Sequence, residues 1–170
     1  LHAGSIELLG RNLLPNPGFE EAGPDRRALG WSFGGKAELL IDPTFAHGGQ
    51  RCAKTRFDDG ASVLFPVTGG EYYRLTGWIR RLDPVGGETP KIKVYFLDVS
   101  GRSTHTVSAE FADVSAAVWT DWESVVRAPL DATQMNLTLR GFYGGNEFFC
   151  WDDLAVTQVE APDWPAWETA

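Results

Sequence analysis

The chain has 170 residues, 43% of them hydrophobic, which predicts one globular domain with a substantial core. Its 15 Lys and Arg stand against 23 Asp and Glu, and the net charge of −8 argues against nucleic acid or an anionic membrane as a partner. No apolar run approaches the ~20 residues of a membrane helix, and residues 1–5 are too short and too polar for a signal peptide.

Glycine pairs divide the chain into short runs in which apolar and polar residues alternate. Short strands separated by regular turn signals predict an all-β sandwich or barrel. We expect strands at residues 37–41, 51–55, 62–67, 73–81, 91–97, 104–111, 122–127, 135–142 and 148–156. Before them, Pro15 and Pro17 cannot donate to a sheet ladder, so residues 12–20 are expected to form an edge strand or an ordered loop.

Alternation in residues 73–81 and 91–97 assigns one face of each strand to the core. The inward residues are Tyr73, Leu75, Gly77 and Ile79 in the first strand, and Ile92, Val94 and Phe96 in the second. Trp78 then points outward among polar residues, which a purely structural sheet face seldom requires. Tyr95 also points outward, and we expect the two rings to lie on adjacent strands and to face the same way.

The strand expected at residues 148–156 carries Cys150 and the pair Asp152-Asp153. Neighbouring side chains of a strand point to opposite faces, so the two aspartates cannot act as a facing carboxylate pair. The only other cysteine is Cys52. Two cysteines are compatible with buried thiols or with a disulfide, which would imply export, and we expect the disulfide between neighbouring strands.

Signatures of catalysis are missing from the chain. It has no Gly-x-Ser-x-Gly, no Walker loop and no His-Glu-x-x-His, and His2, His47 and His105 lie far apart in sequence. Two carboxylates at the ~5–10 Å spacing of a glycosidase could still be assembled from remote positions. The sequence therefore favours a binding or structural domain over an enzyme.

Several short motifs follow one another over residues 12–159. They are Asn-Leu-Leu-Pro-Asn-Pro-Gly-Phe-Glu at 12–20, Gly30-Trp31, Ala46-His47-Gly48-Gly49, the run 70–78, and Trp151-Asp152-Asp153-Leu154. In this order and spacing the chain resembles the carbohydrate-binding modules of the jelly-roll type, in the group with families four, nine and twenty-two. The resemblance implies a β-sandwich jelly roll of two antiparallel sheets.

The resemblance also implies a structural calcium ion. Carried over to this chain, it would be held by Asp152, by backbone oxygens at Gly18 and Gly49, and by the side chain of Glu20. Calcium takes ~6–8 oxygen ligands and mixes carboxylates with carbonyls. The alternative for Asp152 is a carboxylate that caps backbone donors at the strand end. Some members of the group also join these two strands by a disulfide, which would match Cys52 and Cys150.

The expected ligand is a polysaccharide or oligosaccharide, because aromatic rings stack on the apolar faces of sugars and polar groups bind their hydroxyls. We expect Trp78 as the main stacking residue and Tyr95 as the second platform. The expected neighbours in this ligand site are Arg80, Lys93, Asn136, Thr138, Arg140 and Phe142. Two alternatives stay open: a loop such as the one holding Trp119 covers the aromatics, or the site lies at a loop rim with Phe33, Phe57, Tyr143 and Phe148.

The expected protein is thus a non-catalytic module that targets a secreted, modular glycoside hydrolase to a β-glucan or xylan. Residues 12–160 would form the module, residues 1–11 a leader or cloning remnant, and residues 161–170 a linker or C-terminal arm. We expect a monomeric module within a larger chain, bound neither to nucleic acid nor to a membrane. The alternatives are a structural jelly-roll domain that binds no sugar and, with less support, a lyase or hydrolase.

Overall fold

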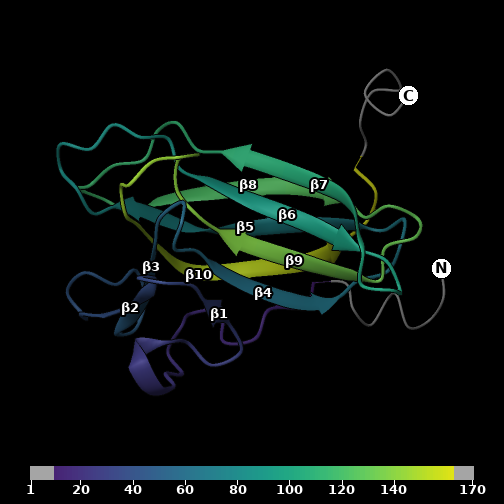
Figure 1. Ribbon diagram of the computed structural model, residues 1–170, viewed down its shortest axis with the longest axis horizontal. Coiled ribbons are helices and arrows are strands. Elements are labelled where there is room, and N and C mark those ends of the chain that lie inside the picture. Colours follow the sequence, from purple (N-terminus) through teal and green to yellow (C-terminus); the bar gives the residue numbers. More distant parts are fainter. Residues whose placement is uncertain (1–9, 163–170) are drawn as a thin grey trace.

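The computed structural model describes residues 10–162 and shows two antiparallel five-stranded sheets packed face to face (Figure 1). We name each sheet after its central strand. The β9 sheet has the order β1 (Ser32–Phe33), β4 (Ala61–Pro66), β9 (Gln134–Leu139), β6 (Lys91–Leu97) and β7 (Ser103–Glu110). The β10 sheet has the order β2 (Glu38–Ile41), β3 (Arg51–Thr55), β10 (Phe149–Val159), β5 (Tyr72–Arg81) and β8 (Thr120–Arg127). The prediction of an all-β jelly-roll sandwich is confirmed.

Consecutive strands tend to lie in different sheets. The chain crosses from β4 to β5, from β5 to β6 and from β9 to β10, and each step changes sheet. Strands that are neighbours in sequence are therefore often on opposite sides of the sandwich, and β10 instead pairs with the distant strands β3 and β5.

The core lies between the sheets and is formed by the inward positions of the alternating strands. Tyr73, Leu75 and Ile79 of β5 are buried, as predicted, and so are the inward residues of β6. Gly77 is required for close packing, because a Cβ there would lie 2.3 Å from Leu154 Cδ2. Trp151 of β10 is fully buried in this core. The alternation that predicts which residues face inward follows from the two-residue period of a strand.

Residues 12–20 form an ordered loop, one of the two expected alternatives. The Asn12 side chain fixes this loop to β10: its Nδ2 donates to Leu154 O at 3.1 Å, and its Oδ1 accepts Val156 N at 3.1 Å. Phe19 at the end of the loop is fully buried in the core. The loop thereby reaches the Asp152–Asp153 region.

The helical content of the described residues is one short 3-10 turn, η1 (Pro24–Arg26). In this part of the chain there is no helix with the length and apolar character needed to span a membrane. Most of the expected leader (residues 1–11) and of the expected C-terminal arm (161–170) lies outside the described residues.

Candidate functional site

The outer surface of the β9 sheet is a polar face with one aromatic residue near its middle. Its outward residues come from β4, β9, β6 and β7, and we call this surface the Tyr95 face. The strand register places Leu64, Asn136, Tyr95 and Thr106 in one row across the sheet. The next row contains Ser62, Thr138, Lys93 and Ser108.

Tyr95 is half-buried and its ring lies over the sheet between polar neighbours. A shallow cavity of about 270 Å³ adjoins it, lined by Tyr95, Leu97, Gly101, Ser103, Asn136 and Thr138. Between the two rows, Thr138 Oγ1 donates to Asn136 Oδ1 at 2.7 Å, which leaves the Asn136 amide nitrogen as a donor. The face therefore combines one flat ring with amide and hydroxyl groups, the combination that binds a sugar ring.

Positive charge gathers at one end of the Tyr95 face, where β6 begins and β9 ends. Lys93 Nζ lies 5.3 Å from the centroid of Tyr95 on its own strand. Arg140 Cζ lies 4.8 Å from the Phe57 ring, and Lys91 Nζ lies 5.0 Å from the Tyr143 ring. We call Lys91, Lys93 and Arg140 the cationic end of the face.

Trp78 does not belong to this face, and its expected pairing with Tyr95 is wrong. Trp78 is on β5 in the β10 sheet, whereas Tyr95 is on β6 in the β9 sheet, so the two rings point away from opposite sides of the sandwich. The His47 ring stacks on Trp78 with 4.1 Å between centroids and 19° between planes. The loop that holds His47 therefore covers Trp78, and a covering loop is one of the alternatives that the sequence left open. Trp119 lies against the same His47 ring, with 5.8 Å between the ring centroids.

Arg80 also lies on the outer side of the β10 sheet, where it contacts other residues of the protein. Its Nε donates to Ala116 O at 2.9 Å, and its Cζ lies 4.3 Å from the Phe45 ring. Of the expected ligand residues, the structure brings together on the Tyr95 face Tyr95, Lys93, Asn136, Thr138 and Arg140. Trp78 and Arg80 lie elsewhere.

The aromatic residues of the loop rim are only partly gathered. Phe57 and Tyr143 lie 4.7 Å apart beside the cationic end, and Tyr143 is 69% exposed. Phe142 is exposed on the same loop after β9. Phe33, in contrast, is buried in the core, and Phe148 lies under Lys54 at 4.5 Å. The rim thus extends the Tyr95 face with two rings rather than forming a separate four-ring site.

Asp152, the expected calcium ligand, is fully buried and accepts three backbone hydrogen bonds. Its Oδ2 accepts His47 N at 3.0 Å and Gly48 N at 3.1 Å, and its Oδ1 accepts Asp153 N at 2.8 Å. Burial raises the pKa of Asp152 to about 7; the Asp153 charge adds to this increase, and the N–H of Gly48 opposes it. These contacts match the capping role that the sequence left open, because both carboxylate oxygens accept backbone hydrogen bonds.

The neighbouring Asp153 lies nearer to the other expected ligands. It adopts a left-handed conformation (φ 47°) at an irregularity of β10, and its Oδ2 lies 2.6 Å from His47 Nδ1. A Cβ built on Gly18 would lie 3.2 Å from Asp153 Oδ1, and one built on Gly49 would lie 2.3 Å from Glu20 Oε1. Of the expected ligands, Gly18 therefore lies beside Asp153, and Gly49 lies beside Glu20.

This arrangement falls short of a formed metal centre. The Glu20 carboxylate accepts backbone hydrogen bonds from Gln50 and Arg51, each at 3.0 Å from Oε1. Within residues 10–162, no three His, Cys, Asp or Glu side chains form a group that could hold a metal ion. The chemistry of the oxygen donors suits Ca²⁺, and the Asp152 oxygens are already used in backbone hydrogen bonds.

The expected disulfide is not formed: Cys52 and Cys150 are free thiols, both buried. They lie on the paired strands β3 and β10, as expected, but not opposite each other, since Cys150 faces Lys54 and Trp151 faces Ala53. Diagonal neighbours of this kind lie on the same face of the sheet, and the two thiols are close enough to interact. Burial raises the pKa of Cys150 well above its usual value, and the Cys52 thiol adds to that increase.

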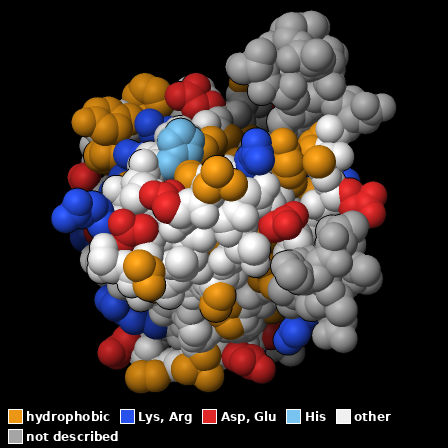
Figure 2. Space-filling view, turned by 90° about the vertical axis from the view of Figure 1, so that its right-hand side faces the viewer, with side chains coloured by type: hydrophobic (Ala, Val, Ile, Leu, Met, Phe, Trp, Pro, Cys, Tyr) orange, Lys and Arg blue, Asp and Glu red, His pale blue; other side chains and the backbone are white. Residues whose placement is uncertain are grey.

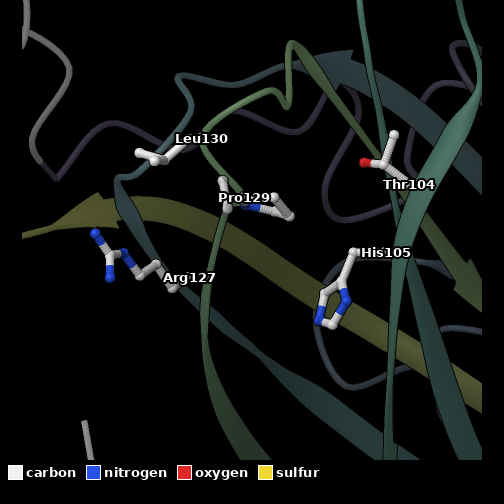
Figure 3. A pocket seen from close by; sticks show the side chains of 6 residues that line it. Thr104, His105, Arg127, Pro129 and Leu130 are labelled. Carbon is white, nitrogen blue, oxygen red and sulfur yellow. The ribbon is translucent and has the colours of Figure 1, made fainter. Parts of the chain in front are cut away.

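A larger cavity, of about 410 Å³, opens at the end of the sandwich where β6 ends and β9 begins (Figures 2 and 3). On this end, apolar, acidic and basic side chains are interspersed (Figure 2). His105 and Arg127 line the cavity but do not converge (Figure 3). Arg127 instead donates from Nε to Gly70 O at 3.1 Å. Without converging polar groups the cavity is a weaker candidate than the Tyr95 face.

Sequence reasoning missed several residues of the Tyr95 face. Leu64, Thr106 and Ser108 point outward by the same alternation that identified Tyr95, but their membership depends on which strands share a sheet. Asp153 is not among the calcium ligands that the resemblance implies. An irregularity between Asp152 and Ala155 interrupts the alternation of β10 at this point.

No protein-family profile and no curated protein sequence matches the chain. Solved structures do resemble it. The CBM22-1 xylan-binding domain of Xyn10C from Paenibacillus barcinonensis has a TM-score of 0.64 at 16% identity, over 91% of this chain and 98% of that one. The CBM22-1-GH10 modules of Clostridium thermocellum xylanase 10B with xylohexaose give 0.61 at 22% identity, over 76% of this chain and 26% of that one.

A third similar structure is TmCBM61 in complex with β-1,4-galactotriose. Its TM-score is 0.51 at 21% identity, and the match covers 88% of this chain and 99% of that one. At these identities the likeness establishes the fold alone, a jelly-roll β-sandwich.

Proposed function

We propose that the chain is a non-catalytic carbohydrate-binding module that holds a polysaccharide on the Tyr95 face. The observation that carries the proposal is the row of Leu64, Asn136, Tyr95 and Thr106, which sets a half-buried ring among hydrogen-bonding groups on an open sheet. A ring of this kind offers a large apolar contact at low entropic cost. The similar structures in complex with xylohexaose and galactotriose support a β-linked glycan.

The composition of the face supports binding rather than hydrolysis. Glycosidases use a pair of carboxylates ~5–10 Å apart. The outward residues of β4, β9, β6 and β7 include one carboxylate, Glu110, at the edge. We propose that the module belongs to a secreted, modular glycoside hydrolase and binds a β-glucan or xylan, raising the local concentration of the enzyme on its substrate. The xylanase modules of similar fold support this assignment.

Replacing Tyr95 by alanine is expected to weaken glycan binding by about 1–3 kcal/mol, because the substitution removes the stacking platform and leaves the outer face otherwise intact. Affinity electrophoresis against soluble β-glucans and xylans measures this loss. Leu130→Ala, an exposed apolar truncation in the loop after β8, is the control and should bind as the wild type does. A folded Tyr95→Ala protein with wild-type affinity would place the site elsewhere, and a wild type that binds no glycan would favour the structural alternative.

We also propose a structural calcium ion at the junction of residues 18–20, 48–50 and the aspartate pair. Glu20 and Asp153 would supply carboxylate oxygens, and Gly18 and Gly49 lie where backbone oxygens could complete the set. The bound ion would place positive charge between two loops and β10. Because it would bind the native state and not the unfolded chain, it would stabilise the native state. Asp152 would keep its capping role beneath it.

Chelation of calcium is then expected to lower the melting temperature by about 5–10 °C. A ligand present at ~100 times its Kd contributes about 2.7 kcal/mol, and a chain of this length loses about 2–4 °C for each kcal/mol. Differential scanning fluorimetry with EDTA and with excess calcium measures the shift. Glu20→Gln should abolish it, while Glu21→Gln, an exposed neighbour, should retain it. A wild-type melting temperature that responds to neither EDTA nor calcium would contradict the site.

A further inference from the structure

We propose that the glycan held on the Tyr95 face carries carboxylates, as in a xylan with uronic acid branches, and that the cationic end binds them. This inference rests on the proposed function and adds the substrate class. Its basis is a cluster of three positive side chains, Lys91, Lys93 and Arg140, on one face of a chain whose net charge is −8.

The three cations take no part in the ion pairs found among the described residues. Those pairs involve His47, Arg51, Lys54, Arg56, Arg74 and Arg81. Lys93 is flanked across the sheet by the uncharged Thr138 and Ser108. Lys91 is opposite Glu110, yet no ion pair joins them. Like charges so placed repel one another, and an anionic ligand relieves that repulsion.

Each of these cations is positioned by an aromatic ring. Lys93 lies over Tyr95, Lys91 over Tyr143 and Arg140 over Phe57. A cation–π contact fixes the position of a charge without using its N–H donors. Among the described residues, the buried Arg140 Nε has no hydrogen-bond partner. Donors held in place but not yet used are suited to a carboxylate, which accepts the short, charge-assisted bonds of Lys and Arg.

The spacing fits a branched glycan. Lys93 precedes Tyr95 by two residues along β6, a separation of about 7 Å on the same face. A sugar stacked on the Tyr95 ring therefore has a positive charge beside it, and the rings of Tyr143 and Phe57 bound the far side of that charge. A backbone sugar would occupy Tyr95, and the acidic branch would reach the cationic end.

The test compares glucuronoxylan with the same polymer after its carboxyl groups have been reduced to alcohols. Affinity electrophoresis and calorimetry with the intact chain should give about 10-fold tighter binding to the native polymer in low salt, because charge-assisted bonds are roughly twice as strong as neutral ones. The advantage should shrink at high salt, where exposed charges are screened. Lys93→Met and Arg140→Met should each bring the ratio of the two affinities toward about 3-fold or less.

Arg74→Gln is the matched control, since it removes one positive charge from an exposed position on the β10 sheet. It should keep the wild-type ratio. Equal binding of both polymers by the wild type, or an equal loss of the ratio in Arg74→Gln, would overturn this inference while the proposed function stands. Failure to bind either polymer or any neutral glycan would overturn both. A melting curve of each variant checks that the protein is folded under the conditions of the binding measurement.

Discussion

Replacing Trp151 by alanine is expected to lower the free energy of unfolding by about 3–5 kcal/mol, the usual cost of truncating a large buried aromatic residue. Trp151, near the start of β10, is fully buried and meets Trp122 edge to face at 6.2 Å between centroids. Its Nε1 donates to Thr55 Oγ1 at 2.8 Å, and Thr55 Oγ1 in turn donates to Arg140 O at 2.8 Å. The substitution leaves a cavity between the sheets and removes the hydrogen bond from Trp151 Nε1 to Thr55 Oγ1.

Urea denaturation followed by circular dichroism measures the loss. Trp78→Ala provides a matched control, because that ring lies on the outer side of the same sheet and is only partly buried. Its truncation should cost clearly less than that of Trp151. Equal losses from the two variants would mean that the core does not centre on Trp151.

Breaking the ion pair of Arg81 and Glu147 is expected to cost about 3–5 kcal/mol, because removing one partner leaves the other charge buried. The two side chains are 9% and 6% exposed, and Arg81 Nη1 contacts Glu147 Oε2 directly. Arg81 Nη2 also donates to Glu88 O at 2.9 Å, and Glu147 Oε1 accepts Glu88 N at 3.1 Å. The pair therefore joins the end of β5 to the loops that hold Glu88 and Glu147.

A double-mutant cycle tests this role. Arg81→Met and Glu147→Leu should each destabilise strongly, and the double variant should recover part of the loss because neither charge is then left alone. Denaturation midpoints of the four proteins give the coupling. Strictly additive losses would show that the two side chains act independently, against the contacts described.

The sequence predicted which residues of each strand face the core, but it did not predict which strands pair with one another. Alternation correctly placed Ile79 and Phe96 in the core and Trp78 and Tyr95 outside. It could not show that β5 and β6 belong to different sheets, because a two-residue period carries no information on pairing partners. The expected site therefore joined residues from two opposite sides of the molecule.

The calcium ligands that the resemblance implies remain a prediction. Gly18 lies beside Asp153 and Gly49 beside Glu20, so the motifs do identify segments that are far apart in sequence and close in the fold. Which aspartate faces them depends on the irregularity of β10, where Asp153 takes φ 47°. A non-glycine residue in the left-handed region is uncommon, and nothing in the local sequence requires it here.

The position of Asn136 beside Tyr95 has a practical consequence for producing the protein. Asn136-Leu137-Thr138 is an N-glycosylation sequon, and its acceptor amide lies in the central row of the Tyr95 face. A eukaryotic secretory host can attach an oligosaccharide to the chain before β9 is paired in its sheet. Such a branch would project from the middle of the proposed site and block it, whereas bacterial expression leaves the amide free. Binding measurements on material from the two kinds of host are therefore comparable only after the mass of the chain has been checked.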